Sequence, residues 1–149
     1  MKNYYMNLAY EEALKAYEQG EVPVGAIIVY NNKVIAKAHN KREKLQKVYA
    51  HAEFLAIKEA SEVLGSWRLN DCDLYITLEP CAMCAGAIIE SRIKNVYFST
   101  NDLKRGASGS IIDLFDLSLG YKVNVEKIDD LGKSQLLLKK FFKSLRNKE

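Results

Sequence analysis

Residues 73–84 read DLYITLEPCAMC and predict a strand that leads directly into a helix. The apolar run over 73–78 favours the strand. Pro80 suits the first turn of a helix, where the missing N–H of proline costs nothing. Cys81 and Cys84 are three positions apart, so a helix that begins here would carry both thiols on one face. The segment therefore predicts two cysteine side chains next to each other at a strand-to-helix turn.

A second motif, His51-Ala52-Glu53, opens the stretch over 50–64, which predicts another helix. A helix N-terminus and a divalent cation both favour the thiolate, which is the form of cysteine that binds metal. If the two helix starts face each other, His51, Cys81 and Cys84 supply three ligands for one metal ion. Zinc held by only three protein groups keeps a fourth position for water, which is typical of catalytic sites.

The glutamate of the first motif gives this pattern a chemical interpretation. Zinc lowers the pKa of a bound water from about 15.7 to near 7, and Glu53 could carry the proton of that water to a leaving nitrogen. A redox pair and half of a structural zinc site are the alternatives for Cys81 and Cys84. The joint pattern of the two motifs favours catalytic zinc over both. The other histidine and the other cysteine, His39 and Cys72, lie outside both motifs.

The rest of the chain alternates helices with strands after an opening hairpin, which predicts a mixed sheet between layers of helices. Asn31-Asn32 is the predicted hairpin turn, and Gly20 and Gly65 end two of the helices. The predicted strands cover 22–30, 34–38, 73–78, 96–99 and 122–125, and the predicted helices cover 4–19, 50–64, 81–91, 111–117 and 133–146. The predicted core contains Ile27, Ile28, Val29, Leu74, Ile76 and Val96.

Length and composition indicate an ordinary globular protein. The chain has 149 residues without a linker or a repeat, so residues 1–149 are expected to form a single domain. Its three cysteines, two of them at metal-ligand spacing, favour a reducing compartment over a disulfide scaffold. The first residues predict an amphipathic helix rather than a signal peptide, and no apolar run approaches the roughly 20 residues that span a bilayer. We therefore expect a cytoplasmic protein with no membrane association.

The net charge of +3 does not by itself indicate nucleic acid, but the basic residues are clustered. One cluster lies beside Asn40, and the other surrounds Phe141 and Phe142 on the C-terminal helix. Cations interleaved with aromatic rings are what single-stranded RNA binding uses. The alternative is that these cations are merely solvated. We expect at least one of the two phenylalanines to pack onto the core, since a helix cannot expose both. The clusters are Lys37, Lys41, Arg42, Lys44 and Lys47, and Lys139, Lys140, Lys143, Arg146 and Lys148.

Taken together, the two motifs resemble the signature of the zinc-dependent nucleobase deaminases. Within that superfamily the sequence is most similar to the bacterial tRNA-specific adenosine deaminases, which convert the wobble adenosine of a tRNA anticodon to inosine. The likeness runs nearly end to end, over residues 21–26, His39-Asn40, residues 74–81, Asp102 with Lys104, residues 106–110 and Phe141-Phe142. It implies the cytidine deaminase-like fold, an α/β architecture in which a three-layer α/β/α sandwich surrounds a mixed sheet of about five strands.

The resemblance also implies a role for each site residue. His51, Cys81 and Cys84 would hold one zinc ion (Zn2+) per subunit, and Glu53 would move protons while water attacks C6 of adenine. The implied substrate contacts are Asn40, the backbone N–H of Ala52, Val24, Asp102 and Lys104. The substrate would be a tRNA anticodon stem-loop, and the protein would be a homodimer. Alternatively, Asn40 could only turn the backbone, and Val24 could be plain core.

The chain departs from the family pattern in two places. Lys47-Val48-Tyr49 stands where the family usually has Asp-Pro-Thr, and Leu119-Gly120-Tyr121 stands where it tends to have an Asn-His pair. Both lie outside the metal and proton-transfer residues, so they concern the substrate pocket and the choice of tRNA. Two other functions stay open: a deaminase of a free base or nucleoside (guanine, cytosine or cytidine), and a noncatalytic RNA-binding partner subunit. The basic clusters favour a polynucleotide substrate, and the presence of Glu53 favours an enzyme.

Overall fold

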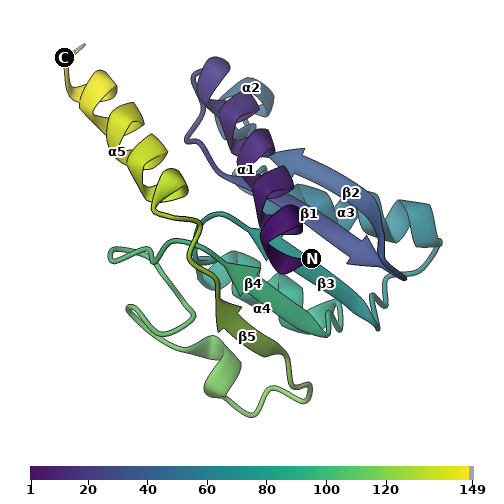
Figure 1. Cartoon of the computed structure of the whole chain (residues 1–149). Helices are drawn as coiled ribbons and strands as arrows, with labels where there is room; N and C mark the ends of the chain where they lie inside the picture. The colour runs from purple at the N-terminus through teal and green to yellow at the C-terminus, as the bar shows by residue number, and fades with distance from the viewer. Residues whose placement is uncertain (148–149) are drawn as a thin grey trace.

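The computed structural model describes residues 1–147, and its strands form one five-stranded sheet in the order β2-β1-β3-β4-β5 (Figure 1). The strands are β1 (Gly25–Tyr30), β2 (Lys33–His39), β3 (Cys72–Ile76), β4 (Asn95–Phe98) and β5 (Asn124–Lys127). β1 runs antiparallel to β2 and β3, while the β3–β4 and β4–β5 pairs are parallel. The sheet is therefore mixed, as the sequence predicts.

Helices cover both faces of this sheet. α1 (Lys2–Glu18) crosses one face, and α3 (Ala52–Leu64) and α4 (Ala82–Glu90) cover the other (Figure 1). α5 (Lys133–Arg146) lies beside α1. Two short elements, α2 (Arg42–Leu45) and the 3-10 turn η1 (Leu114–Asp116), lie in connections. The predicted three-layer α/β/α sandwich is confirmed. Within residues 1–147, no helix is both long and apolar enough to cross a membrane.

Side chains alternate between the two faces along each strand, because successive residues of a strand point in opposite directions. Ile27, Val29 and Tyr75 pack under α1. Their neighbours in the strands, such as Ile28 and Leu74, pack instead against α3 and α4. All the predicted core residues are buried, namely Ile27, Ile28, Val29, Leu74, Ile76 and Val96.

The local turn signals act as predicted. Asn31 and Asn32 have φ values of +51° and +61°, and a type I′ hairpin turn requires positive φ at both of its central positions. Gly65 ends α3 in the left-handed conformation, with φ +62°. These two turns set where β2 begins and where α3 ends.

Most predicted elements differ from the structure by one or two residues at an end, and three of the differences have a structural meaning. The first strand begins at Gly25 rather than at residue 22, because the N–H of Val24 donates to the carbonyl of Val22 (2.9 Å) and closes a tight turn around Pro23. The last strand covers Asn124–Lys127, where it pairs with β4, and not 122–125. The helix predicted over 111–117 is only the 3-10 turn η1.

The helix α2 was not predicted from the sequence, since it spans only four residues. The buried carboxylate of Glu21 accepts hydrogen bonds from the N–H groups of Glu43 (3.1 Å) and Lys44 (2.8 Å). A carboxylate satisfies the unpaired N–H groups of a helix start in this way even when it comes from a distant residue. A tertiary contact therefore stabilises α2.

The prediction that Phe141 or Phe142 packs into the core is wrong. Phe141 is half-buried, with its ring edge-on to that of Tyr17 in α1 (centroids 6.4 Å apart), and Phe142 is 41% exposed. α5 is buried instead through its first turns, at Ser134, Leu137 and Leu138. Of the basic residues predicted on this helix, Lys148 lies outside the described residues.

Gly25 is the point where β1 approaches α1 most closely, and it generates a test of the fold. A Cβ atom at this position would lie 2.0 Å from the carbonyl oxygen of Ala9 and 2.4 Å from the nitrogen of Ala13. We expect Gly25→Ala to lower the free energy of unfolding by about 1–3 kcal/mol or more, because backbone must move to admit the methyl group.

Gly86→Ala is the matched control for this prediction, and urea denaturation of both variants measures the difference. A Cβ atom at Gly86, inside α4, meets no heavy atom within 4 Å other than the backbone of its own helix. This substitution should raise the free energy of unfolding by about 0.5–1 kcal/mol, since alanine favours helix over glycine. Equal effects of the two substitutions would contradict the close approach at Gly25.

Candidate active site

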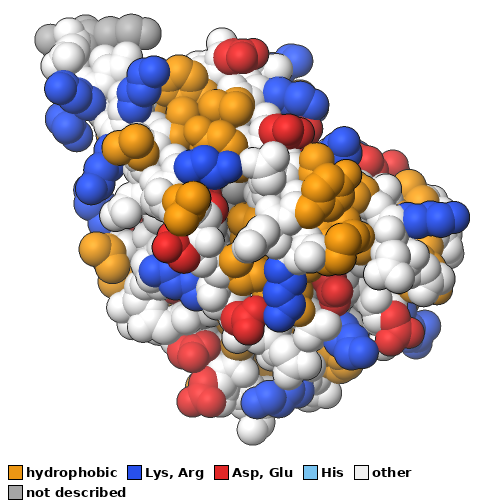
Figure 2. All heavy atoms as spheres, viewed as in Figure 1, with side chains coloured by type: hydrophobic (Ala, Val, Ile, Leu, Met, Phe, Trp, Pro, Cys, Tyr) orange, Lys and Arg blue, Asp and Glu red, His pale blue; other side chains and the backbone are white. Residues whose placement is uncertain are grey.

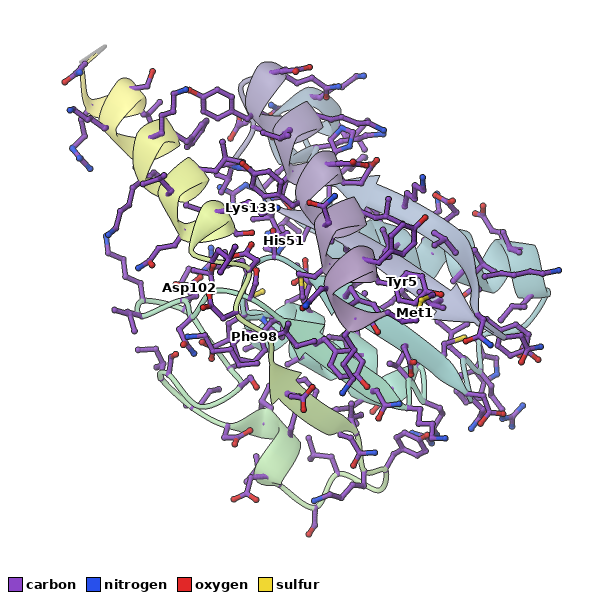
Figure 3. All side chains as sticks on the ribbon, viewed as in Figure 1. Met1, Tyr5, His51, Phe98, Asp102 and Lys133 are labelled. Atoms are coloured by element: carbon purple, nitrogen blue, oxygen red, sulfur yellow. The ribbon has the colours of Figure 1, made fainter. Side chains whose placement is uncertain are left out.

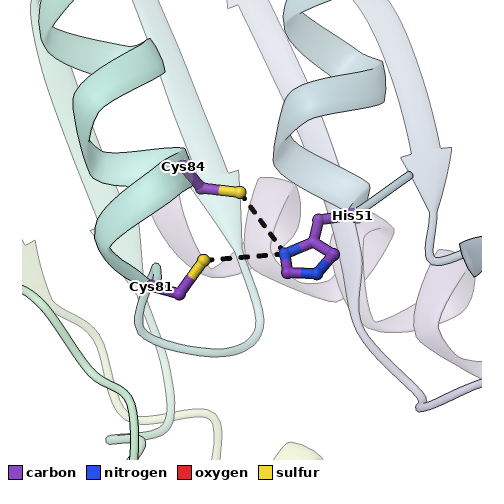
Figure 4. A group of neighbouring side chains, drawn as sticks. All are labelled: His51, Cys81 and Cys84. Atoms are coloured by element: carbon purple, nitrogen blue, oxygen red, sulfur yellow. Dashed lines mark hydrogen bonds between the residues drawn. The ribbon is translucent and has the colours of Figure 1, made fainter. Parts of the chain in front are cut away.

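Two helix starts bring the predicted metal ligands together. His51 is the N-cap of α3, Cys81 is the N-cap of α4, and Cys84 lies in the first turn of α4. The Nδ1 atom of His51 lies 3.7 Å from the Sγ of Cys81 and 3.5 Å from the Sγ of Cys84 (Figure 4). All three donor atoms lie within 4.8 Å of one another. They therefore surround one common point.

This donor set fits zinc. With Zn–N distances of about 2.0–2.1 Å and Zn–S distances of about 2.3 Å, a tetrahedral ion holds its nitrogen and sulfur ligands about 3.6 Å apart. The distances between Nδ1 and the two Sγ atoms agree with this value. Within residues 1–147, no other group of three or more His, Cys, Asp or Glu side chains converges in the same way. The geometry can thus hold one zinc ion through three protein ligands.

The protonation of the three ligands is coupled. Hydrogen bonds from Cys84 and His51 lower the pKa of Cys81 to about 3, although burial opposes ionisation. The hydrogen bond with Cys81 and burial raise the pKa of Cys84, so one thiol keeps its proton in the metal-free protein. The hydrogen bond with Cys81 likewise raises the pKa of His51. Since a metal ion binds thiolates and neutral imidazole, its binding must release these protons.

Glu53 lies beside the ligands, in the first turn of α3, and is only 4% exposed. Burial raises the pKa of its carboxyl group to about 7. It adjoins Cys84, whose thiol lies within hydrogen-bonding reach. A carboxyl group with a pKa near neutrality can both accept and deliver a proton at physiological pH. Glu53, which the sequence predicts as the proton-transfer residue, thus has a pKa suited to that role.

Asn40 and Ala52 are bonded to each other. The N–H of Ala52, at the start of α3, donates to the Oδ1 of Asn40 at 2.7 Å, and the N–H of Asn40 donates to the carbonyl of Val24 at 3.1 Å. Val24 itself is buried in the core. These contacts tie the end of β2 to the helix start that carries His51.

Asp102 and Lys104 lie in the loop that follows β4. Because β3 and β4 are parallel, this loop and the turn that carries Cys81 lie at the same edge of the sheet. Figure 3 shows Asp102 and His51 at that end of the molecule. The Oδ1 of Asp102 accepts hydrogen bonds from the N–H groups of Lys104 and Arg105, both at 3.1 Å. The loop thus stands next to the metal ligands.

Glu79 is a site residue to which the sequence analysis gave no role. Its side chain is buried, yet it accepts hydrogen bonds from Asn101, Asp102, Ser108 and Ser110. Burial opposes ionisation of its carboxyl group, but these donors hold the pKa below its ordinary value. A signal existed in the sequence, since a carboxylate between a buried strand and a proline must find donors or remain costly to bury.

The basic clusters lie at the surface. Figure 2 shows Lys and Arg side chains along α5 at the upper left, with apolar atoms between α5 and α1. The ammonium group of Lys140 lies 5.5 Å from the centroid of the Tyr17 ring. In the other cluster, Arg42, Lys44 and Lys47 are exposed around α2. In the departure at 47–49, Val48 and Tyr49 are exposed, and Tyr49 packs on Phe54 (centroids 5.6 Å apart).

Comparison with known proteins agrees with this geometry. A family model described as MafB19-like deaminase matches residues 1–146. The chain is 45% identical over 147 residues to the tRNA-specific adenosine deaminase of Bacillus subtilis (strain 168), which covers 97% of this chain and 91% of that protein.

Solved structures extend the comparison. One comes from a study of A-to-I editing by tRNA:A34 deaminases at the wobble position of transfer RNA; it has a TM-score of 0.87 and 40% identity, and the match covers 90% of this chain and 98% of that one. The guanine deaminase of Bacillus subtilis is less similar, with a TM-score of 0.63, 30% identity and coverage of 78% and 85%. The chain belongs to the family of tRNA-specific adenosine deaminases.

Proposed function

We propose that this protein hydrolytically deaminates adenosine to inosine at the wobble position of a tRNA anticodon. The observation that carries the proposal is the convergence of His51, Cys81 and Cys84 beside the buried carboxyl group of Glu53. The near-full-length similarity to tRNA-specific adenosine deaminases supports the choice of substrate. The catalytic unit is a single domain over residues 1–149, with one zinc ion per subunit.

In this proposal, Glu53 transfers the protons. When bound, zinc would supply an activated water at neutral pH. The pKa of about 7 lets the Glu53 carboxylate take a proton from water and return it to the leaving amino group. Ammonia and inosine are the products.

The remaining predicted residues would bind the nucleotide. The Oδ1 of Asn40 is held by the N–H of Ala52, so its Nδ2 is oriented to donate to an acceptor on the edge of the base. The N–H of Ala52, which the resemblance assigns to the substrate, is bonded to Asn40 instead, so Ala52 would act by orienting Asn40. Val24 is buried and would support the wall of the pocket. Asp102 and Lys104, across the same sheet edge, would approach the ribose and the phosphate of a neighbouring nucleotide.

An RNA substrate explains the basic surface better than a free base does. The exposed cations around α2 and along α5 would contact phosphates, which a free base lacks. A base in an anticodon loop is already unpaired, so that only its unstacking must be overcome before it enters the pocket. The weaker similarity to guanine deaminase supports the same choice. We further propose that the protein is cytoplasmic. We also propose that it forms a homodimer, which the exposed apolar side chains of Val48, Ile111 and Leu117 support.

The first prediction concerns the substrate. The zinc-loaded protein should form inosine from an anticodon stem-loop with adenosine at the wobble position, and little or none from free adenosine. Incubation with this stem-loop, free adenosine, guanine and cytidine, followed by nucleoside analysis, compares the alternatives. Deamination of guanine or cytidine without inosine in the stem-loop would contradict the proposal, and no turnover of any substrate would favour a noncatalytic subunit.

The second prediction concerns Glu53. Glu53→Ala should bind zinc as the wild type does, because Glu53 supplies no ligand atom, but its turnover should fall by at least about a hundredfold. Elemental analysis and stem-loop deamination measure the two effects. Glu59→Ala, an exposed glutamate on the same helix, is the control and should retain both. Unimpaired turnover of Glu53→Ala would remove Glu53 from the mechanism.

A further inference from the structure

The loop over residues 101–110 folds around the carboxylate of Glu79, which comes from outside the loop. The side chain is 2% exposed and accepts hydrogen bonds from five donors of that loop. Its Oε1 accepts from the Nδ2 of Asn101 (3.1 Å), the N–H of Asp102 (3.0 Å) and the hydroxyl of Ser110. Its Oε2 accepts from the N–H groups of Ser108 (2.9 Å) and Ser110 (3.1 Å).

The backbone joins the same two segments. The N–H of Glu79 donates to the carbonyl of Thr100, and the N–H of Ala107 donates to the carbonyl of Pro80, both at 2.8 Å. Gly106 passes so close that a Cβ atom there would lie 2.3 Å from the Cδ of Glu79. The loop is thus attached to the turn that places Cys81 at the metal centre.

The loop has no helix or strand of its own, so its N–H groups need other acceptors. The side chain and the carbonyl of Asp102 accept from Lys104, Arg105 and Gly106, and Glu79 accepts from Asp102, Ser108 and Ser110. Ala107 is buried, but Leu103 at the tip is 78% exposed. Hydrogen bonds to an ionised acceptor are roughly twice as strong as neutral ones. One buried anion therefore holds both ends of the loop, at residues 101–102 and 108–110.

We infer that Glu79 is a positioning residue, which holds the 101–110 loop at the metal centre so that Asp102 and Lys104 meet the nucleotide next to the reacting base. The carboxylate of Glu79 accepts a hydrogen bond from the N–H of Asp102, and the side chain of Asp102 in turn accepts one from the N–H of Lys104. The role in holding the loop stands on the contacts alone. The role toward the nucleotide rests on the proposed function.

Glu79→Gln tests this inference. In this variant the side-chain NH2 group of glutamine would face N–H donors that meet a carboxylate oxygen in the wild type. The loop should therefore open. The backbone amides of Asp102, Ser108 and Ser110 should exchange with deuterium at least about tenfold faster, since a hydrogen bond to a charged group contributes on the order of 1.5–3 kcal/mol. Zinc content should stay as in the wild type. KM for the stem-loop should rise about tenfold while kcat changes much less.

A merely structural role would not reproduce two further results. Lys104→Ala should raise KM in the wild type, but it should add little in the Glu79→Gln protein, because both substitutions remove the same contact. Glu79→Asp, which restores the charge, should recover part of the exchange protection and of the KM. Glu12→Gln is the control, since Glu12 is also buried but binds Lys15 and His39 instead; it should leave exchange over 101–110 unchanged.

Gly106→Ala opens the loop from the other side and leaves the carboxylate intact, so it carries the test if Glu79→Gln loses zinc. It should raise both amide exchange and KM. Unchanged exchange in Glu79→Gln and Gly106→Ala would overturn the inference, as would fully additive effects of Glu79→Gln and Lys104→Ala. A wild-type protein that forms no inosine would instead overturn the proposed function and the role toward the nucleotide, while the exchange measurement would still decide whether Glu79 holds the loop.

Discussion

The contact of His51, at the start of α3, with Cys81 and Cys84, at the start of α4, constrains how both helices pack on the sheet. The imidazole of His51 meets the thiols of Cys81 and Cys84 only if both helices lie on the same face of the sheet, with their N-termini at the same edge. β3 delivers Cys81 to that edge, and Asn40 at the end of β2 ties down the helix start of His51 through the N–H of Ala52. The sheet is the frame that brings distant parts of the chain to one point.

The electrostatics of the site follow from this arrangement. Hydrogen bonds from the Cys84 thiol and the His51 imidazole favour negative charge on Cys81, while burial raises the pKa of the Glu53 carboxyl group to about 7. The metal-free cluster therefore holds protons that a dication must displace. Its affinity for zinc should fall as the pH is lowered. Next to it, Glu79 is an anion satisfied by five donors. The pKa values of these two buried glutamates thus shift in opposite directions: burial outweighs the hydrogen bonds at Glu53, and the donors outweigh burial at Glu79.

Local signals could be read from the sequence, and distant contacts could not. Asn31-Asn32 and Gly65 act on their own neighbours, so the hairpin and the end of α3 were predictable. The start of α4 was predictable to within one residue, but Pro80 precedes the N-cap Cys81 and does not lie in the first turn of the helix as expected. The ligand triad was predictable because two short motifs occur together. α2 was missed because its cap, Glu21, comes from more than twenty residues earlier. The role of Glu79 was missed for the same reason, since its donors lie 22–31 residues further along the chain. The exposure of Phe142 depends on how α5 packs on α1, which helix periodicity does not specify.

X-ray absorption at the zinc edge is the most direct test of the central claim, that one imidazole and two thiolates hold the metal. For the zinc-loaded protein, we predict two sulfur ligands at about 2.3 Å and one imidazole nitrogen at about 2.0 Å, completed by a light atom. Cys81→Ala should lose zinc or one sulfur, and Cys72→Ala, which removes the buried cysteine outside the cluster, should leave the spectrum unchanged. A zinc shell without sulfur, or one altered by Cys72→Ala and not by Cys81→Ala, would contradict the account.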